Sequence, residues 1–466
     1  MTTPAADATA SRGRGRGLSD ACASVVRTLR TDRALAVVVT ATIVGLVLRV
    51  VSAAIAARAP KGLFDPARYA GYARVIADGQ GMVEPLTGQP TAYYPPGYPW
   101  FLGIIQWGID HTPLPDDLAL VTALVQAVLG AASVALIGTL GRRIHSPAAG
   151  AVAAVVVALM PNLVLHSSTV LGETLTIALL LAFLVALVPP PGHRPWPAGM
   201  GRRRLATAGV LLGLVLLVRP VTAGVLVAVA VCWWISGIGW RRTATWTGVL
   251  LGIAVLCIVP WTVRNAIRMD ALVPLSTNSG DNLCIGHGPS ATGSFRLDED
   301  CAIQGNVVDG TAVEVSSDRE KTDLALSRWR RGWRDEPGLT VNRLRFTVER
   351  DDDALRALQS YGLDPWLDDG AETVLSRASN GAWFVVGLVG LVGLVKLSWT
   401  GEGQRLLVPL TVLSVLAAPL LTFGDPRFKV PVVPLMALAA AVAVTRRSVL
   451  RPPPSVEGDQ GATPRT

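Results

Sequence analysis

Two acidic residues stand where an apolar segment of the chain meets a hydrophilic one. Asp65 follows the first long apolar run by a few residues, and Glu173 opens a later one. A carboxylate held at a membrane surface can accept the proton of a hydroxyl group while that oxygen attacks an electrophilic carbon, which is general base catalysis. In this interpretation the two carboxylates face each other across a catalytic site. The alternatives are a solvated aspartate at a loop start, and a glutamate that complements a helix N-terminus or pairs with an arginine.

Basic residues gather at the same ends of the apolar runs. Arg49 lies within the first run, where an unpaired charge is costly enough to require a partner. A phosphate or diphosphate group fits, because guanidinium groups bind it through paired hydrogen bonds and stabilise it as a leaving group. For any single residue, snorkelling to lipid headgroups or pairing with Asp270 or Asp425 explains the charge equally well. The other members of this set are Arg219, Arg264, Arg427 and Lys429.

The motifs of common soluble enzymes are absent from the sequence. It contains no Walker A loop, no GxSxG and no HExxH, and its five histidines are scattered. Its five cysteines show no CxxC spacing, which argues against a zinc site. Cys284 and Cys301 fall in one hydrophilic segment and would pair only in an oxidising compartment, although spacing alone does not establish a disulfide.

The elements that position these residues follow from hydropathy. Half of the 466 residues are hydrophobic and only 16% are charged, a composition suited to a lipid environment. Apolar runs of membrane-spanning length recur about ten times, so the sequence predicts an all-α integral membrane protein with about ten transmembrane helices. Pro161 and Pro220 interrupt two of the regions and predict bent or shortened spans. The runs lie near 34–57, 117–140, 147–165, 169–188, 205–218, 221–239, 243–262, 380–398, 405–423 and 428–445.

Arginine placement predicts the orientation in the membrane. The net charge of +8 is spread between apolar runs rather than gathered in one patch, which argues against nucleic-acid binding. With both termini cytoplasmic, every inner loop is basic, as the positive-inside rule requires. The inner residues are Arg142, Arg143, Arg202 to Arg204, Arg241, Arg242, Lys396, Arg405, Arg446 and Arg447.

This orientation divides the chain into five parts. Residues 1–33 form a basic cytoplasmic tail, and 34–262 form an N-terminal transmembrane domain whose first outer loop spans 58–116. Residues 263–379 form a large outer-face domain, with a Gly/Ser/Asn-rich loop first and helices after it. Residues 380–447 are the C-terminal transmembrane helices, and 448–466 form a disordered cytoplasmic tail rich in proline and polar residues.

Several of these segments, taken in order, resemble the bacterial glycosyltransferases of family 39, which are related to the protein O-mannosyltransferases and the lipid A aminoarabinose transferase. The shared features span most of the chain. They are Arg49, Asp65 with Tyr69 and Ala73, Gly79 and Gly81, Tyr94-Pro95-Pro96-Gly97-Tyr98-Pro99, Glu173, Arg219-Pro220, Pro260-Trp261-Thr262-Val263-Arg264-Asn265, Pro274-Leu275-Ser276-Thr277-Asn278 and Arg427-Phe428-Lys429-Val430-Pro431.

The resemblance implies the C-type glycosyltransferase membrane fold and makes Asp65 the candidate catalytic base, with Glu173 beside it. It also implies that Tyr69, Tyr94 and Asn265 join the basic residues in binding a lipid-linked sugar donor. Many relatives have two adjacent acidic residues in the first loop, whereas Pro66 follows Asp65 here. We therefore expect no bound divalent metal, since such ions prefer several carboxylate oxygens.

These observations predict a membrane enzyme that moves a hexosyl or pentosyl group, with inversion, from a polyprenyl-phosphate donor to a protein, lipid or glycan acceptor at the outer face of the plasma membrane. A secondary transporter is the first alternative, but its functional charges would be expected near the membrane midplane, between related halves. A non-catalytic envelope assembly protein is the second alternative, but it does not explain why arginines gather at the outer ends of the helices.

Overall fold

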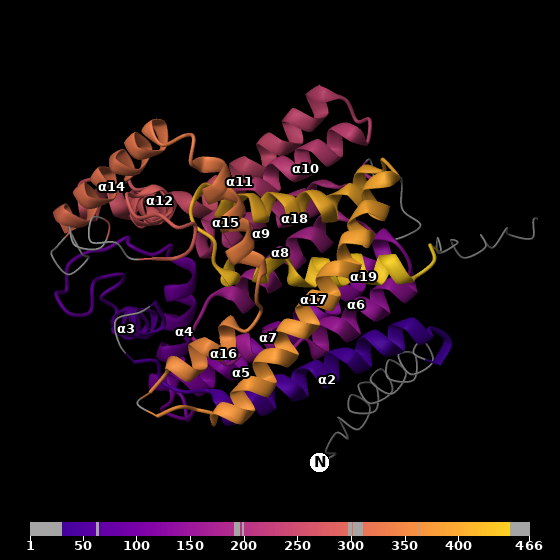
Figure 1. Ribbon diagram of the computed structural model, residues 1–466, viewed down its shortest axis with the longest axis horizontal. Coiled ribbons are helices and arrows are strands. Elements are labelled where there is room, and N and C mark those ends of the chain that lie inside the picture. The colour runs from indigo at the N-terminus through magenta and orange to yellow at the C-terminus, as the bar shows by residue number, and fades with distance from the viewer. Residues whose placement is uncertain are drawn as a thin grey trace, which may run out of the picture.

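The computed structural model is helical throughout the part of the chain that it describes (Figure 1). It describes residues 30–61, 65–190, 196–197, 200–296, 301, 311–362 and 364–447. Extended pairing within these residues is limited to two isolated bridges, Val83 with Pro90 and Ser294 with Gly424. Most of the predicted N-terminal tail and all of the C-terminal tail lie outside the described residues.

Within the described residues, six helical segments are long and apolar enough to cross a membrane. At a rise of about 1.5 Å per residue, helices of 19 to 31 residues span most or all of a hydrocarbon core of about 30 Å. The chain is therefore a membrane protein. The six segments are α2 (Arg33–Ala56), α5 (Leu118–Ile144), α11 (Trp240–Met269), α17 (Asp369–Trp399), α18 (Gly403–Leu421) and Pro426–Val444, which comprises η3 (Pro426–Phe428), η4 (Val430–Val432) and α19 (Val433–Val444).

The other four apolar runs are also helical but form shorter elements. Proline ends a helix because its ring removes a backbone donor and clashes with the preceding turn. Pro161 accordingly separates two helices, and Pro220 opens a short 3-10 turn, as the sequence predicted. The number of membrane crossings therefore stays a prediction. These elements are α6 (Pro147–Leu159), α7 (Pro161–His166), α8 (Glu173–Leu187), α9 (Arg202–Val218), η1 (Pro220–Ala223) and α10 (Gly224–Ile235).

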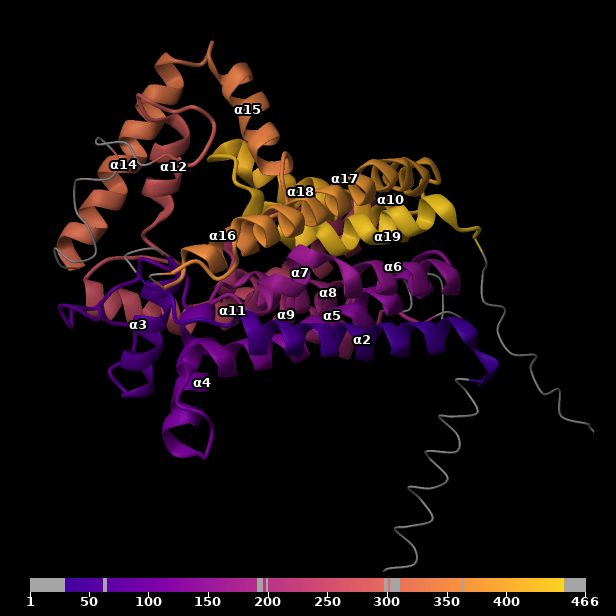
Figure 2. The ribbon, with the colours of Figure 1, turned by 60° about the horizontal axis from the view of Figure 1, so that its bottom comes forward.

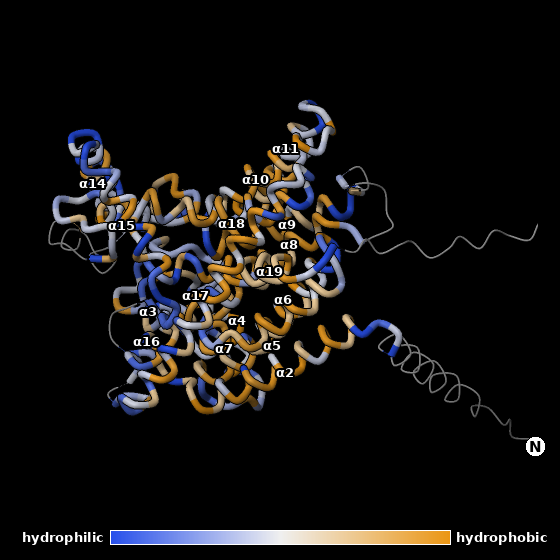
Figure 3. Tube along the Cα trace, turned by 45° about the vertical axis from the view of Figure 1, so that its right-hand side comes forward, coloured by the Kyte–Doolittle hydropathy of each residue, from blue (hydrophilic) through white to orange (hydrophobic). Residues whose placement is uncertain are grey.

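The helices differ in how deeply they sit in the bundle. We compare the buried share of an apolar 18-residue stretch in each span. It is 72% in the C-terminal segment Pro426–Val444 and only 17% in α11. Small residues allow the central helices to approach closely, since a Cβ on Gly393 of α17 would lie only 1.7 Å from the carbonyl oxygen of Ala439 in α19. The exposed apolar side chains of α2, α11 and α17 then face lipid, and Figure 3 shows hydrophobic residues along the outside of the bundle.

Hydrophilic elements gather at the end of the bundle opposite the start of α2 and the end of α19 (Figure 2). The segment predicted as the first outer loop contains two helices that the sequence analysis missed, α3 (Asp65–Ala77) and α4 (Gly97–His111). The large later segment contains α12 (Ser279–His287), α14 (Thr311–Arg331), α15 (Glu336–Val348) and α16 (Asp353–Ser360). Its first helix lies inside the stretch that was predicted to be a loop.

A disulfide stabilises this later segment. Cys284, in α12, bonds to Cys301 with a Cα–Cα distance of 5.7 Å. The pairing that the sequence left open is therefore present in the structure.

Candidate active site

Asp65 begins α3 and holds its carboxylate between two donors. Its Oδ1 accepts a hydrogen bond of 2.7 Å from the Tyr94 hydroxyl, and its Oδ2 lies 3.2 Å from Nη1 of Arg427. The Asp65 side chain keeps 42% of its surface exposed. Burial raises the pKa of Tyr94 well above its ordinary value, so the tyrosine stays protonated and donates. A negative carboxylate is thus oriented and still open to a ligand.

Glu173 opens α8 and is fully buried. Its Oε1 accepts from Nη1 of Arg219 at 2.7 Å and from Nε of Arg427 at 2.9 Å. A buried carboxylate is stable only when it is paired in this way. Asp65, Glu173, Arg219 and Arg427 form one unit, which we name the arginine–carboxylate cluster, and its two positive charges balance its two negative ones.

The local backbone explains why both arginines reach Glu173. Arg219 follows the last turn of α9 in an extended conformation, because Pro220 prevents the helix from continuing. Arg427 lies in η3, where Oδ1 of Asp425 accepts from its backbone N–H at 2.8 Å. The Phe428 ring lies 5.7 Å from the guanidinium carbon of Arg219 and packs the two loops together.

Tyrosines form a wall beside Asp65. The Tyr69 ring lies 4.7 Å from the Tyr94 ring and 5.2 Å from the Tyr98 ring. Tyr72 donates to Glu84 at 2.9 Å, while Tyr93 donates to Asp281 of α12 at 2.6 Å. The wall therefore connects the first hydrophilic segment to the later one.

A second group of charges holds the backbone that leads to Tyr94. Arg264 of α11 donates to the carbonyl oxygens of Thr91, at 2.9 Å, and Met82. Glu314 of α14 accepts from the Thr91 hydroxyl at 2.7 Å and from the Ala92 N–H at 3.0 Å.

Thr277 completes this second group. It donates its hydroxyl to Glu314 and its backbone N–H to Ala92. We name Arg264, Thr277 and Glu314 the 91–92 clamp. Asn265, next in the chain, donates to the Val273 carbonyl at 2.9 Å and is fully buried. Arg264 and Asn265 therefore lie against backbone and share no hydrogen-bond partner with Arg427.

Lys429 is also buried away from the cluster. Its Nζ lies 2.9 Å from Oδ1 of Asp351 and donates to the Arg350 carbonyl at 2.6 Å. It sits 5.1 Å from the centre of the Trp383 ring. Lys429 thus ties η3, which bears Arg427, to the segment that leads into α16.

Arg49 finds its partners within the membrane domain. It donates to the Val157 and Ala158 carbonyls at 3.2 and 3.4 Å, beside the break before Pro161, and to Gly45 of its own helix. A helix that ends at a proline leaves carbonyls without intrahelical donors. The cost of burying Arg49 is thus offset by backbone rather than by an anion.

Sequence reasoning missed several buried groups around the site. Asp353, which begins α16, accepts from Asn162 at 2.9 Å and lies 2.9 Å from Nε2 of His166. Burial works against its ionisation, but His166, Lys429 and Asn162 together hold the pKa of Asp353 below its ordinary value. The acidic run 351–353 was a visible signal, yet nothing in the sequence connects it to His166. Glu314 carried no such signal.

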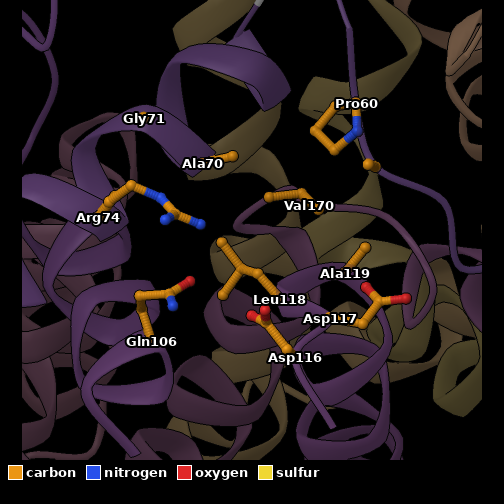
Figure 4. Close-up of a pocket in the computed structure, with 11 residues that line it drawn as sticks. Pro60, Ala70, Gly71, Arg74, Gln106, Asp116, Asp117, Leu118, Ala119 and Val170 are labelled. Carbon is orange, nitrogen blue, oxygen red and sulfur yellow. The ribbon is translucent and has the colours of Figure 1, made fainter. Parts of the chain in front are cut away.

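A cavity lies on another face of α3. It has a volume of about 550 Å³ and is lined by Arg74, Gln106 and Asp116 among others (Figure 4). Successive helical residues are rotated by about 100°, so Arg74 points away from the side that presents Asp65. The cavity therefore does not contain the arginine–carboxylate cluster. Within the described residues, no three His, Cys, Asp or Glu side chains are arranged to hold a metal ion.

Comparison with known proteins gives a match in fold but not in sequence. No protein-family model matches the chain, and no curated protein does so. The oligosaccharyltransferase of Archaeoglobus fulgidus, in its apo form, aligns with a TM-score of 0.52 and 15% identity over 88% of this chain and 50% of that one.

The same archaeal enzyme, AglB, in complex with an inhibitory peptide and a dolichol-phosphate gives a TM-score of 0.50 at 14% identity, over 89% of this chain and 50% of that one. ArnT from Cupriavidus metallidurans, bound to undecaprenyl phosphate, gives 0.41 at 15% identity, over 87% and 77%. The chain spans about half the length of the archaeal enzyme. It shares the helical fold of the archaeal oligosaccharyltransferase, and the all-α architecture that the sequence predicted is confirmed in the described residues.

Proposed function

We propose that the protein transfers a sugar from a polyprenyl-phosphate donor to an acceptor hydroxyl at the outer face of the membrane, with inversion, and that Asp65 is the general base. The observation that carries this proposal is the accessible Asp65 carboxylate held against Arg427, which shares Glu173 with Arg219. Base and phosphate-binding groups are then adjacent, which such a reaction requires.

In the proposed reaction the acceptor hydroxyl gives its proton to Asp65 while its oxygen bonds to the anomeric carbon. The bond from that carbon to the phosphate oxygen breaks, and the electron pair stays on the phosphate. Arg219 and Arg427 stabilise this charge. Each guanidinium has five N–H groups, and Glu173 and Asp65 occupy only some of them, so the others are free for phosphate.

Glu173 is assigned a positioning role. It is buried and its Oε1 already accepts from both arginines, so it orients them, whereas Asp65 is accessible to an acceptor. Arg264, Asn265, Lys429 and Arg49 direct their donors to backbone or to Asp351. We assign these four residues to holding the site in place rather than to contacting the phosphate.

Two observations support an outer location of the cluster. Disulfides persist in oxidising compartments, and the Cys284–Cys301 disulfide lies in the segment that contacts the cluster's neighbours. Arg142 and Arg143 end α5, and Arg202 begins α9, at helix ends that the positive-inside rule assigns to the cytoplasm. About ten crossings with both termini inside fit this placement.

Mass spectrometry of envelope glycans and glycoproteins, from cells with and without the protein, tests the proposal. The expected result is one glycan or glycoprotein that lacks a hexosyl or pentosyl unit in the deleted cells, together with accumulation of the polyprenyl-phosphate donor. Identical glycans and donor levels in both strains would overturn the proposed transfer.

A further inference from the structure

The turn between α14 and α15 exposes large apolar side chains. Trp329 and Trp333 are 48% and 64% exposed, and on α15 the residues Val341 and Leu344 are 66% and 45% exposed. Val341 and Leu344 are three residues apart, so they share one side of the helix. Four large apolar side chains exposed on a hydrophilic segment make this region a candidate interaction site.

The same turn is strongly basic. Residues 328–345 contain six arginines and only two acidic residues. Arg343 is buried and pairs with Glu336, but within the described residues Arg328, Arg330 and Arg334 form no ion pair. The Arg334 guanidinium lies 5.6 Å from the centre of the Trp333 ring. The surface therefore combines exposed tryptophan with unneutralised positive charge.

The position of the turn is fixed by the end of a membrane span. Nε2 of His287 lies 3.0 Å from the carbonyl oxygen of Leu421, the last residue of α18, and Arg343 donates to the Leu420 carbonyl at 2.9 Å. Trp329 packs edge-on against His287, with ring centres 6.3 Å apart. Figure 2 shows α15 running from this turn down to α18, while the turn itself stands away from the other helices.

We propose that Trp329, Trp333, Val341 and Leu344, with Arg328, Arg330 and Arg334, form a membrane anchor that rests in the headgroup layer of anionic phospholipid beside α18. Tryptophan is enriched at this depth, and arginines near an anionic surface are attracted to it.

The anchor is connected to the candidate active site through one helix. The tryptophans and arginines of the anchor begin at the C-terminal end of α14. Glu314 of the 91–92 clamp lies in the first turn of the same helix. A helix of 21 residues is about 30 Å long, so it transmits position between the two ends. Contact with lipid at one end thus steadies the segment that holds Thr91 and Ala92 at the other.

Depth-dependent quenching tests the anchor without requiring sugar transfer, so its outcome is independent of the proposed activity. The experiment uses the full-length protein with its disulfide intact and with alanine in place of Cys22, Cys232 and Cys257. The substitution Trp333→Cys then gives a single free thiol, to which an environment-sensitive fluorophore is attached. It is reconstituted in vesicles of phosphatidylcholine and phosphatidylglycerol that contain lipids brominated near the headgroup. Ser316→Cys, at an exposed position on the first half of α14, is the matched control.

We expect the label at position 333 to emit at shorter wavelength and to be quenched several-fold more strongly than the label at 316. Replacing Arg328, Arg330 and Arg334 by glutamine, or using phosphatidylcholine alone, should reduce that quenching. Equal and weak quenching at both positions would overturn the anchor. Strong quenching at position 333 that changes neither with lipid charge nor with the arginine substitutions would overturn the assignment to anionic lipid.

Discussion

The arginine–carboxylate cluster and the 91–92 clamp use the same residue types but differ in what their charges contact. In the cluster, guanidinium groups meet carboxylates, and Asp65 keeps 42% of its side chain exposed. In the clamp, Arg264 and Glu314 meet backbone carbonyl and N–H groups, and Glu314 is almost fully buried. Charges that pair with an accessible side chain can exchange partners with a ligand, whereas charges that satisfy buried backbone cannot leave without a penalty.

The largest effect is expected for Asp65→Asn. Asparagine keeps the size and much of the hydrogen bonding of aspartate but accepts no proton, so only the step that needs a base should suffer. General base catalysis contributes on the order of a hundred- to ten-thousand-fold, and kcat for sugar transfer by the purified protein should fall within that range. Binding of the donor lipid should persist. Turnover close to that of the wild type would show that Asp65 is not the general base and would leave it only its contacts with Tyr94 and Arg427.

The next largest effect is expected on stability, when the buried Lys429–Asp351 ion pair near Arg427 is broken. Lys429→Met removes the cation that pairs with the buried Asp351 carboxylate, and removing one partner of a buried ion pair costs about 3–5 kcal/mol. We expect a clear drop in the thermal unfolding temperature of the purified protein. The double variant Lys429→Met with Asp351→Asn should recover most of it. If the double variant were as unstable as the sum of the single ones, the two residues would not act as a pair.

Tyr94→Phe removes the hydroxyl that donates to Asp65 and leaves the ring in the wall. A hydrogen bond to a charged group is worth about 1.5–3 kcal/mol, so kcat/KM should fall by roughly ten- to a hundredfold. The matched control is Tyr72→Phe, whose hydroxyl donates to Glu84 instead. Equal losses in the two variants would show that the wall matters only for folding.

Much of the helical framework could be predicted from the sequence, because a chain in lipid must satisfy its backbone within helices. All ten apolar runs are helical, and the breaks at Pro161 and Pro220 lie where proline chemistry requires them. The helix α4 was missed because it is too short to span a membrane and follows a proline-rich turn. Its alternation of buried Leu102 and Ile105 with exposed Ile104 and Trp107 was nevertheless a visible signal.

The candidate site was predictable in composition but not in arrangement. Arg264 and Arg427 both follow or precede apolar runs, and sequence gives no reason to treat them differently. Tertiary structure separates them, since Glu173 and Asp65 reach Arg427 while backbone carbonyls reach Arg264. Such contacts join residues more than 150 positions apart, a distance at which local patterns contain no information.

The smallest effect is expected for the pH dependence of the stability that Glu314 of the 91–92 clamp contributes. Burial raises the pKa of Glu314 in the folded protein. Its contribution to stability is therefore fully present below the unfolded value of about 4.3 and is lost as pH rises through the folded pKa. The thermal unfolding temperature of Glu314→Gln, minus that of the wild type, should increase across this range. A difference that stays constant with pH would show that the pKa of Glu314 is not raised in the folded protein.

The most direct test of the difference between cluster and clamp is the affinity of the purified protein for a polyprenyl phosphate that bears no sugar. Arg427→Gln removes a charged donor that we assign to the phosphate, and the dissociation constant should rise at least about tenfold. Arg264→Gln, compared per folded molecule, should leave it within about twofold. A weakening by Arg264→Gln that equals or exceeds that by Arg427→Gln would contradict the account, since the phosphate would then bind at the clamp.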